Sequence, residues 1–267
     1  MAEDKAGGWG VGESVKTSRE AIRPVLSPRK RTVLAASAGV FAGLYAVLGL
    51  VPISALIGIS GFITFREAVS PLSGMLLGPA AGGLSIILGV ILDFGLGRPV
   101  VFFGFDFCVD LAAAVTAGLC FTGRRLMAVL FPAGVIILLE LGPSAPTFVS
   151  VGTTLVPFVW MHVLSVGLLA GALAAEKAGK VSRLSPIFVV AVTFAATMCG
   201  HAAGGILTEV FYLNSGVLFG FASAGAYWSY IFYLYPVERV FLTMVGSALA
   251  VPVLRAVDAR RKRPTVS

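Results

Sequence analysis

Ten charged side chains interrupt otherwise apolar stretches of this sequence, and they are the groups best placed to do chemistry. A charge inside a membrane span is costly unless it is paired or hydrated, so a chain that keeps this many is expected to hold an outward-facing polar cavity. The alternative is that these charges only pair with one another or lie in loops. The ten residues are Arg66, Glu67, Asp93, Arg98, Asp106, Asp110, Glu140, Glu209, Glu238 and Arg239.

These side chains predict binding without specifying the ligand. The arginines suit a carboxylate or a phosphate, but acids outnumber arginines seven to three in this set. A cationic ligand is therefore equally open. We take eight of the ten as candidate substrate-binding residues: Arg66, Glu67, Asp93, Arg98, Glu140, Glu209, Glu238 and Arg239.

Patterns for catalysis and metal binding are poor. His162 and His201 are the only histidines, and Glu209 follows His201 by eight residues, which places the two only partly on one helix face. A metal site needs more ligands than this. The motifs of zinc proteases, serine hydrolases and ATP-binding loops are also missing. The sequence therefore predicts no enzyme, no metal site and no cofactor.

Composition sets the class of protein. The 267 residues are 57% hydrophobic and 12% charged, which is about half the charge of a soluble domain. This indicates a polytopic membrane protein folded as an all-α helix bundle. The net charge of +7 falls mostly in short basic blocks beside apolar stretches, so it is expected to set topology rather than to bind nucleic acid.

The apolar stretches predict about eight membrane spans, with six as the alternative. Pro52–Phe65 is expected to be an irregular outer segment, and the tyrosines of residues 227–235 to form an aromatic belt at the outer interface. Pro236 is expected to open the last span. The eight expected spans are Thr32–Val51, Ala68–Leu77, Pro79–Leu96, Phe103–Phe121, Leu126–Leu141, Leu155–Ala175, Pro186–Tyr212 and Pro236–Leu254.

Lysine and arginine predict where the termini lie. Every one of them except Arg66, Arg98 and Arg239 falls in the N-terminal tail, in two inner loops or in the C-terminal tail. Because basic residues collect on the cytoplasmic side, both termini are expected in the cytoplasm. Residues 1–31 are expected to be a disordered cytoplasmic tail, 32–255 one transmembrane domain, and 256–267 a basic cytoplasmic tail.

Residues Met75–Asp93 combine a turn with a packing helix. Pro79 cannot continue a helix that arrives from Leu77, because it lacks the amide hydrogen and its ring clashes with the preceding turn. Gly78 and Pro79 therefore predict a tight reversal. The glycines that follow leave bare patches on the next helix, where a neighbouring backbone can approach closely.

The first span carries a flat face of small residues. Ala38, Ala42 and Ala46 recur every four residues, so they lie on one side of a helix. Such a face invites a partner helix. The partner is either another span of this chain or a separate subunit.

Three segments together resemble the substrate-binding S components of energy-coupling-factor transporters. They are the Ala38-x-x-x-Ala42 pair, the run MLLGPAAGGLSIILGVILD over residues 75–93, and the run PVERVFLTMVGSALAVPVLRA over residues 236–256. The resemblance implies uptake of a vitamin-like molecule or a metal ion held near the outer face. It also implies docking through Ala38, Ala42 and Ala46 on a transmembrane coupling subunit, with an ATPase pair supplying the energy. S components usually have six spans.

The sequence therefore predicts a multi-pass protein of the cell membrane, surrounded by lipid, that binds a small-molecule substrate for uptake. One alternative is a self-contained ion-coupled secondary transporter or channel, in which Asp93, Glu140 or Glu209 carries protons or cations. Another is a non-catalytic structural membrane subunit without a ligand.

Overall fold

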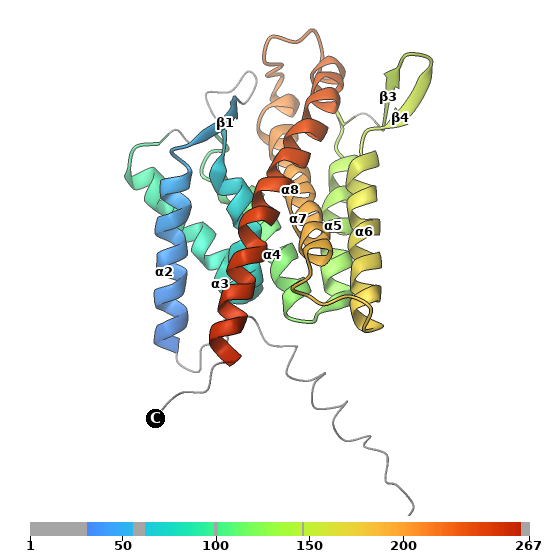
Figure 1. The fold of residues 1–267 in the computed structure, drawn as a ribbon. Helices are drawn as coiled ribbons and strands as arrows, with labels where there is room; N and C mark the ends of the chain where they lie inside the picture. Colours follow the sequence, from blue (N-terminus) through green and yellow to red (C-terminus); the bar gives the residue numbers. More distant parts are fainter. Residues whose placement is uncertain (1–30, 56–61, 99–100, 146, 263–267) are drawn as a thin grey trace, which may run out of the picture.

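The computed structural model describes residues 31–55, 62–98, 101–145 and 147–262, and within them it shows seven α-helices and two short β-hairpins (Figure 1). The expected all-α bundle is confirmed at this level. The helices are α2 (Arg31–Leu48), α3 (Phe65–Gly95), α4 (Phe107–Phe121), α5 (Arg125–Glu140), α6 (Trp160–Lys177), α7 (Pro186–Phe211) and α8 (Ala224–Lys262), with a short 3-10 turn, η1 (Leu213–Ser215), after α7.

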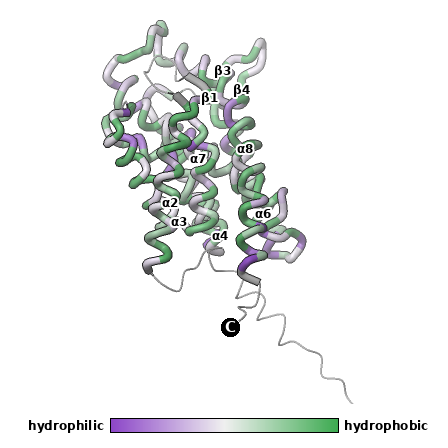
Figure 2. The backbone as a smooth tube through the Cα atoms, turned by 60° about the vertical axis from the view of Figure 1, so that its left-hand side comes forward, coloured by the Kyte–Doolittle hydropathy of each residue, from purple (hydrophilic) through white to green (hydrophobic). Residues whose placement is uncertain are grey.

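Three helices of the described chain are long and apolar enough to cross a membrane: Phe65–Gly95, Pro186–Ser215 and Ala224–Arg260. Hydrophobic residues run along most of each helix in Figure 2. Large apolar side chains also point outward, among them Val40, Ile187 and Val237, each at least 70% exposed. A lipid environment suits such a surface better than water does, so the structure is compatible with a membrane protein.

Helix α3 reverses direction in its middle. Gly78 has φ 82° and ψ 173°, a conformation that glycine adopts without strain, and Pro79 begins the second half. Arg66 and Asp93 are 27 residues apart, which is about 40 Å along a straight helix. Yet Arg66 Nη1 lies 2.6 Å from Asp93 Oδ2. The two halves therefore run antiparallel, and the reversal predicted at Gly78 and Pro79 is confirmed.

Close backbone contact between the two halves depends on glycine. A Cβ atom added at Gly82 would lie 2.8 Å from the Cα atom of Gly74. Real side chains do not approach a backbone so closely, so the second half of α3 packs directly on the first. Small residues let helices associate in this way within lipid.

The small-residue face of α2 is already covered by this chain. Ala38, Ala42 and Ala46 are 3%, 1% and 5% exposed, and α2 packs along α3, where Gly89 faces Tyr45 and the Ala42 carbonyl. The partner of this face is thus another helix of the same chain. This is the first of the two alternatives for the face, and the docking of a coupling subunit on Ala38, Ala42 and Ala46 stays a prediction, with these side chains covered by α3.

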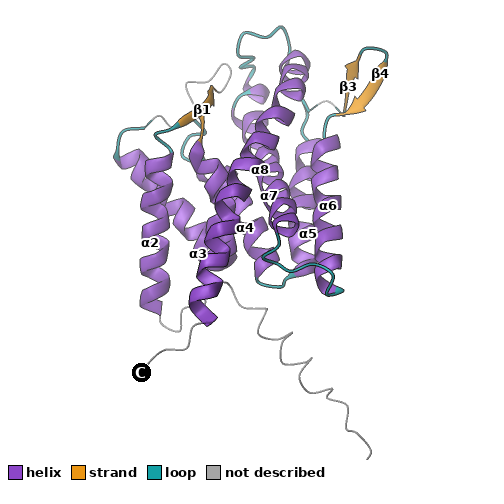
Figure 3. Cartoon of the chain, in the orientation of Figure 1, coloured by secondary structure: helices purple, strands orange, loops and turns teal. Residues whose placement is uncertain are grey.

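The β-hairpins replace two stretches predicted otherwise (Figure 3). Strand β1 (Pro52–Ala55) pairs with β2 (Phe62–Thr64) in the segment expected to be irregular. Strand β3 (Phe148–Val151) pairs with β4 (Thr154–Pro157), so α6 begins at Trp160 rather than at Leu155. In each hairpin the backbone satisfies its own hydrogen bonds across the pair, which an apolar sequence alone does not reveal.

Helix α8 passes through Pro236 instead of starting there. It begins at Ala224, and Trp228, Phe232 and Tyr235 are buried along one side of it. Packing of these rings keeps the chain helical across the missing amide hydrogen of proline. Residues 256–262 also continue α8, while the tail expected at 1–31 lies outside the described residues except for Arg31, which begins α2.

The two ends of the bundle differ. Both β-hairpins lie at one end, which we call the hairpin end, and the last turn of α8 lies at the other (Figure 1). The loops that join α4 to α5 and α6 to α7 also lie at this other end, which we call the basic end. It carries Arg124, Arg125, Lys177, Lys180 and Arg183.

An ion-pair network joins four segments at the basic end. Glu176 on α6 accepts hydrogen bonds from Arg125 on α5, at 2.7 Å, and from Arg183, at 2.8 Å. Arg183 also donates to the Phe121 carbonyl at the end of α4. Burial alone raises the pKa of Glu176, but the hydrogen bonds from the two arginines outweigh burial and hold that pKa below its ordinary value.

We expect Gly82→Ala to destabilise the fold by about 1–3 kcal/mol, since the added methyl group must push the two halves of α3 apart. Gly39→Ala is the matched control, because a Cβ atom at Gly39 meets nothing within 4 Å. Thermal unfolding in detergent measures both. Equal melting temperatures for the two variants would contradict the packing described for α3.

The Glu176 network predicts acid sensitivity. Because the pKa of Glu176 is lower in the folded protein than its ordinary value of 4.5, its stabilisation is present above that value and is lost as the pH falls through the folded pKa. Glu176→Gln should have a lower melting temperature than the wild type at pH 7. The difference between the two melting temperatures should shrink as the pH falls below 4.5. A pH-independent difference between the two proteins would argue against this role.

Candidate functional site

A partly open cavity of about 140 Å³ lies among α3, α4, α7 and α8, toward the hairpin end. Charged side chains and aromatic rings line it, together with the glycines 200, 204 and 205 of α7. A cavity of similar size, engineered in another protein, accommodates benzene. The space therefore fits a small ring or a compact polar molecule.

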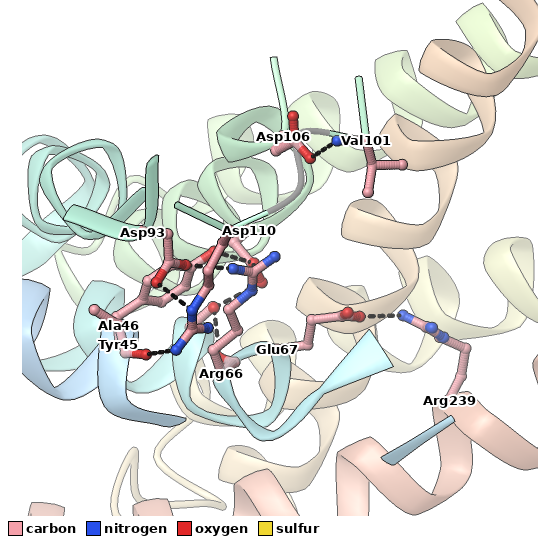
Figure 4. A network of polar contacts seen from close by, with 11 residues as sticks. Tyr45, Ala46, Arg66, Glu67, Asp93, Val101, Asp106, Asp110 and Arg239 are labelled. Atoms are coloured by element: carbon pink, nitrogen blue, oxygen red, sulfur yellow. Dashed lines mark hydrogen bonds and ion pairs between the residues drawn. The ribbon is translucent and has the colours of Figure 1, made fainter. Parts of the chain in front are cut away.

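Asp93 is held between two arginines behind the charged wall (Figure 4). It is 2% exposed, with Arg66 Nη1 at 2.6 Å and Arg98 Nε at 3.3 Å from its two oxygens. Arg98 also donates to the Ala46 carbonyl at 2.8 Å. The carboxylate thus ties the second half of α3 to the first half and, through Arg98, to the end of α2.

Asp110 is a second acid that holds Arg66. It accepts hydrogen bonds from the Tyr45 hydroxyl and from Ser70 Oγ, the latter at 2.7 Å, and its Oδ2 lies 3.9 Å from Arg66 Nε. The Arg66 guanidinium also lies over the Tyr45 ring, 5.3 Å from its centre, in a cation–π contact. Arg66 is therefore fixed from three sides on the cavity wall.

Arg239 on α8 forms the second cationic point of the wall. It is 4% exposed, and its guanidinium lies 3.4 Å from Glu67 and 3.7 Å from Glu238. Its Nε atom is buried and has no hydrogen-bond partner among the described residues. A buried donor without a partner is unfavourable, so the ion pairs with Glu67 and Glu238 must offset this cost.

Asp106 has a local structural role. Its carboxylate accepts from the backbone amides of Val101 and Phe102, at 2.8 and 3.1 Å. These bonds hold the segment that precedes α4 against the cavity, which Val101 and Phe102 also line. Asp106 lines the cavity while its oxygens are already engaged.

The aromatic wall comes from α8 and corrects the expected aromatic belt. Trp228 and Tyr235 are each 1% exposed and line the cavity, whereas Tyr230 and Tyr233 point outward. Trp228 Nε1 donates to Glu209 Oε1 at 3.1 Å. Glu209 therefore positions the ring of Trp228 and does not itself line the cavity.

Two histidines meet at the floor of the cavity. His162 Nε2 and His201 Nδ1 are 2.9 Å apart, and His201 lines the cavity. They come from α6 and α7 and are 39 residues apart, a separation that carries no sequence signal. Among the described residues no group of three or more His, Cys, Asp or Glu side chains is arranged to hold a metal ion.

The structure brings seven of the eight candidate residues into one neighbourhood. Four line the cavity, two stand behind Arg66, and Glu209 stands behind Trp228. Glu140 is the exception: it ends α5, and its buried Oε1 has no partner among the described residues. The eight candidates leave out seven residues that complete the site, of which only Asp110 stood among the ten charged residues singled out from the sequence: Tyr45, Ser70, Asp110, His162, His201, Trp228 and Tyr235.

No family model, curated protein or solved structure matches this chain. The resemblance to S components therefore stays a prediction that rests on three short segments. One of them, the Ala38–Ala42 pair, packs inside the chain. The function is inferred from the cavity and its side chains, since function follows from a site and not from a fold alone.

A double-mutant cycle tests the pairing of Arg66 with Asp93. Asp93→Asn should lower the free energy of unfolding by about 3 kcal/mol, because it leaves two partly buried arginines without their shared counter-ion. Arg66→Gln should cost less once Asp93→Asn is present, so the two changes should couple by about 1 kcal/mol or more. Strictly additive effects in thermal or denaturant unfolding would rule out the pairing.

Proposed function

We propose that this chain is a membrane uptake component that binds a small organic molecule in the cavity at its hairpin end. The observation that carries the proposal is the lining of the cavity, in which the charged side chains of Arg66, Glu67, Glu238 and Arg239 lie beside the buried rings of Trp228 and Tyr235. Binding pockets for small molecules combine apolar or aromatic walls with a few convergent polar groups.

The charges around the cavity narrow the class of molecule. Three arginines face five acids in this neighbourhood, namely Glu67, Asp93, Asp106, Asp110 and Glu238, and most of them are paired with each other. A fully charged anion would compete with these acids. A neutral or amine-bearing ring of vitamin-like type fits better than a phosphate ester does.

The proposal includes topology and a partner. With the two halves of α3 counted separately, the described part of the chain has eight helical segments that alternate in direction, so α2 begins and α8 ends at the basic end. We assign that end to the cytoplasm, where basic residues collect. The described residues contain no ATP-binding loop, so uptake is assigned to a complex with a transmembrane coupling subunit and an ATPase pair.

Native mass spectrometry tests the proposal on protein gently solubilised from its own cells. We expect co-purifying subunits of the coupling module and a bound small molecule. Arg239→Met and Trp228→Leu should lose the small-molecule mass, while Val237→Ala, an outward-facing change on the same helix, should keep it. A wild-type chain that carries neither a partner nor a ligand would refute the proposal.

One observation favours a second candidate, a self-contained ion-coupled transporter. On α7, His201, Thr197 and Thr193 are spaced four residues apart, and Arg239, Thr243 and Ser247 are spaced likewise on α8. Thr197 and Thr243 lie 3.2 Å apart, whereas the buried hydroxyls of Thr193 and Ser247 have no partner among the described residues. A column of hydroxyls thus leads from the cavity toward the basic end.

Reconstitution separates the two candidates. The purified chain in liposomes should bind the co-purified molecule without accumulating it if a coupling module is required. Accumulation driven by a proton or sodium gradient, and its loss in Thr197→Val with Ser247→Ala, would support the second candidate instead. Binding of the molecule serves as the fold control for this variant.

A further inference from the structure

Each histidine of the pair at the cavity floor has one ring nitrogen that takes no part in the hydrogen bond between them. His162 is fully buried, and its Nδ1 has no hydrogen-bond partner among the described residues. His201 is partly exposed and lines the cavity. Its Nδ1 is engaged by His162, so its Nε2 is the ring nitrogen left for the cavity.

The shared hydrogen bond couples the proton positions of the two rings. No carboxylate is bonded to either ring in the described part of the chain, and a buried charge without a partner is costly, so both rings are neutral. A neutral imidazole carries one N–H and one bare nitrogen. If His162 Nε2 donates, His201 carries its proton on Nε2. If His201 Nδ1 donates, His201 presents a bare Nε2 instead.

The buried side of His162 decides between these arrangements. When His162 Nε2 is the donor, its Nδ1 is a bare acceptor without a partner. In the other arrangement, Nδ1 is an N–H donor without a partner, and buried orphan N–H groups are the rarer of the two in proteins. The Phe158 carbonyl, four residues earlier and just before α6 begins, accepts from the Tyr235 hydroxyl at 2.9 Å and is not a partner of His162 Nδ1, which has none among the described residues.

Aromatic packing keeps both rings in place. The Tyr235 ring lies 4.8 Å from the His201 ring and 5.3 Å from the His162 ring, measured between their centres. The Phe158 ring also stacks on the His162 ring, with 6.4 Å between their centres. The imidazoles therefore cannot rotate freely to change which ring nitrogen faces the other histidine.

We propose that His162 fixes His201 as a hydrogen-bond donor on the cavity floor, so that the cavity selects a planar molecule carrying a hydrogen-bond acceptor, such as a ring nitrogen or a carbonyl oxygen. The identification of this acceptor as part of a substrate rests on the proposed function. The proton positions of the two rings do not.

Nitrogen NMR reads the proton positions directly. The chain has two histidines, so ¹⁵N-histidine labelling of the full chain in lipid nanodiscs gives four ring signals. We expect the Nε2 signals of both rings at the position of protonated nitrogen and both Nδ1 signals at that of bare nitrogen. A bare Nε2 on His201 would overturn the proposal.

Two variants of His162 test whether it sets the state of His201. His162→Phe removes the donor, so the Nε2 signal of His201 should shift toward a mixture of the two forms. His162→Gln restores a donor near the same position, and the protonated Nε2 signal should return. An unchanged His201 signal in His162→Phe would overturn the role of His162. If that variant fails to fold, the wild-type spectrum still tests the proton positions.

Pyridine and pyrrole test the selectivity of the cavity. They are similar in size, but pyridine offers a ring-nitrogen acceptor and pyrrole an N–H donor. At a pH where pyridine is neutral, titration followed at His201 Nε2 should show pyridine binding about tenfold more tightly, the effect of one net hydrogen bond. Equal binding, tighter pyrrole binding or no binding of either would overturn the selectivity. If both rings show protonated Nε2 but no molecule co-purifies with the chain, only the proposed function is refuted.

Discussion

The pairing of Arg66 with Asp93 is the contact on which the site depends. The two residues stand at opposite ends of α3 in sequence and meet only because the helix reverses at Gly78. Once Arg66 is fixed, Tyr45 from α2 and Asp110 from α4 gather around it. Three helices thus share one partly buried guanidinium, and a charge in this position is tolerated because two acids and a ring surround it on the side away from the cavity.

The interior changes character along the bundle. Toward the basic end the core is built mainly from aliphatic side chains, alanines and a few phenylalanines of α3, α4 and α7, with Met75 and Ala195 fully buried. Toward the hairpin end, the core is rich in aromatic rings, with Trp228 and Tyr235 at its centre. Large rigid rings with hydrogen-bonding tips leave a space beside them more readily than close-packed alanines do, which explains why the cavity lies at the hairpin end.

The polar groups of the cavity fall into two sets with different consequences. Asp93, Asp110 and Glu209 are engaged by neighbouring donors and hold other side chains in place. His201 lines the cavity with its Nε2 left over once Nδ1 is engaged by His162, and the Arg239 guanidinium adds further N–H donors to the lining. The first set makes the site rigid, and the second gives it a preference for acceptors. Pre-organised donors of this kind favour one orientation of a small bound molecule at little entropic cost.

The sequence by itself determined the helical class, the apolar stretches and the reversal at Gly78 and Pro79, because backbone sterics and hydropathy act locally. It also picked out Arg66, Glu67, Glu238 and Arg239, since charges are conspicuous in apolar sequence. Only the tertiary structure decided which charges meet, that Ala42 faces α3, that α8 runs through Pro236, and that His162 joins His201. These outcomes depend on side chains distant in sequence packing together, and packing can override the local preference of a proline or a small-residue face.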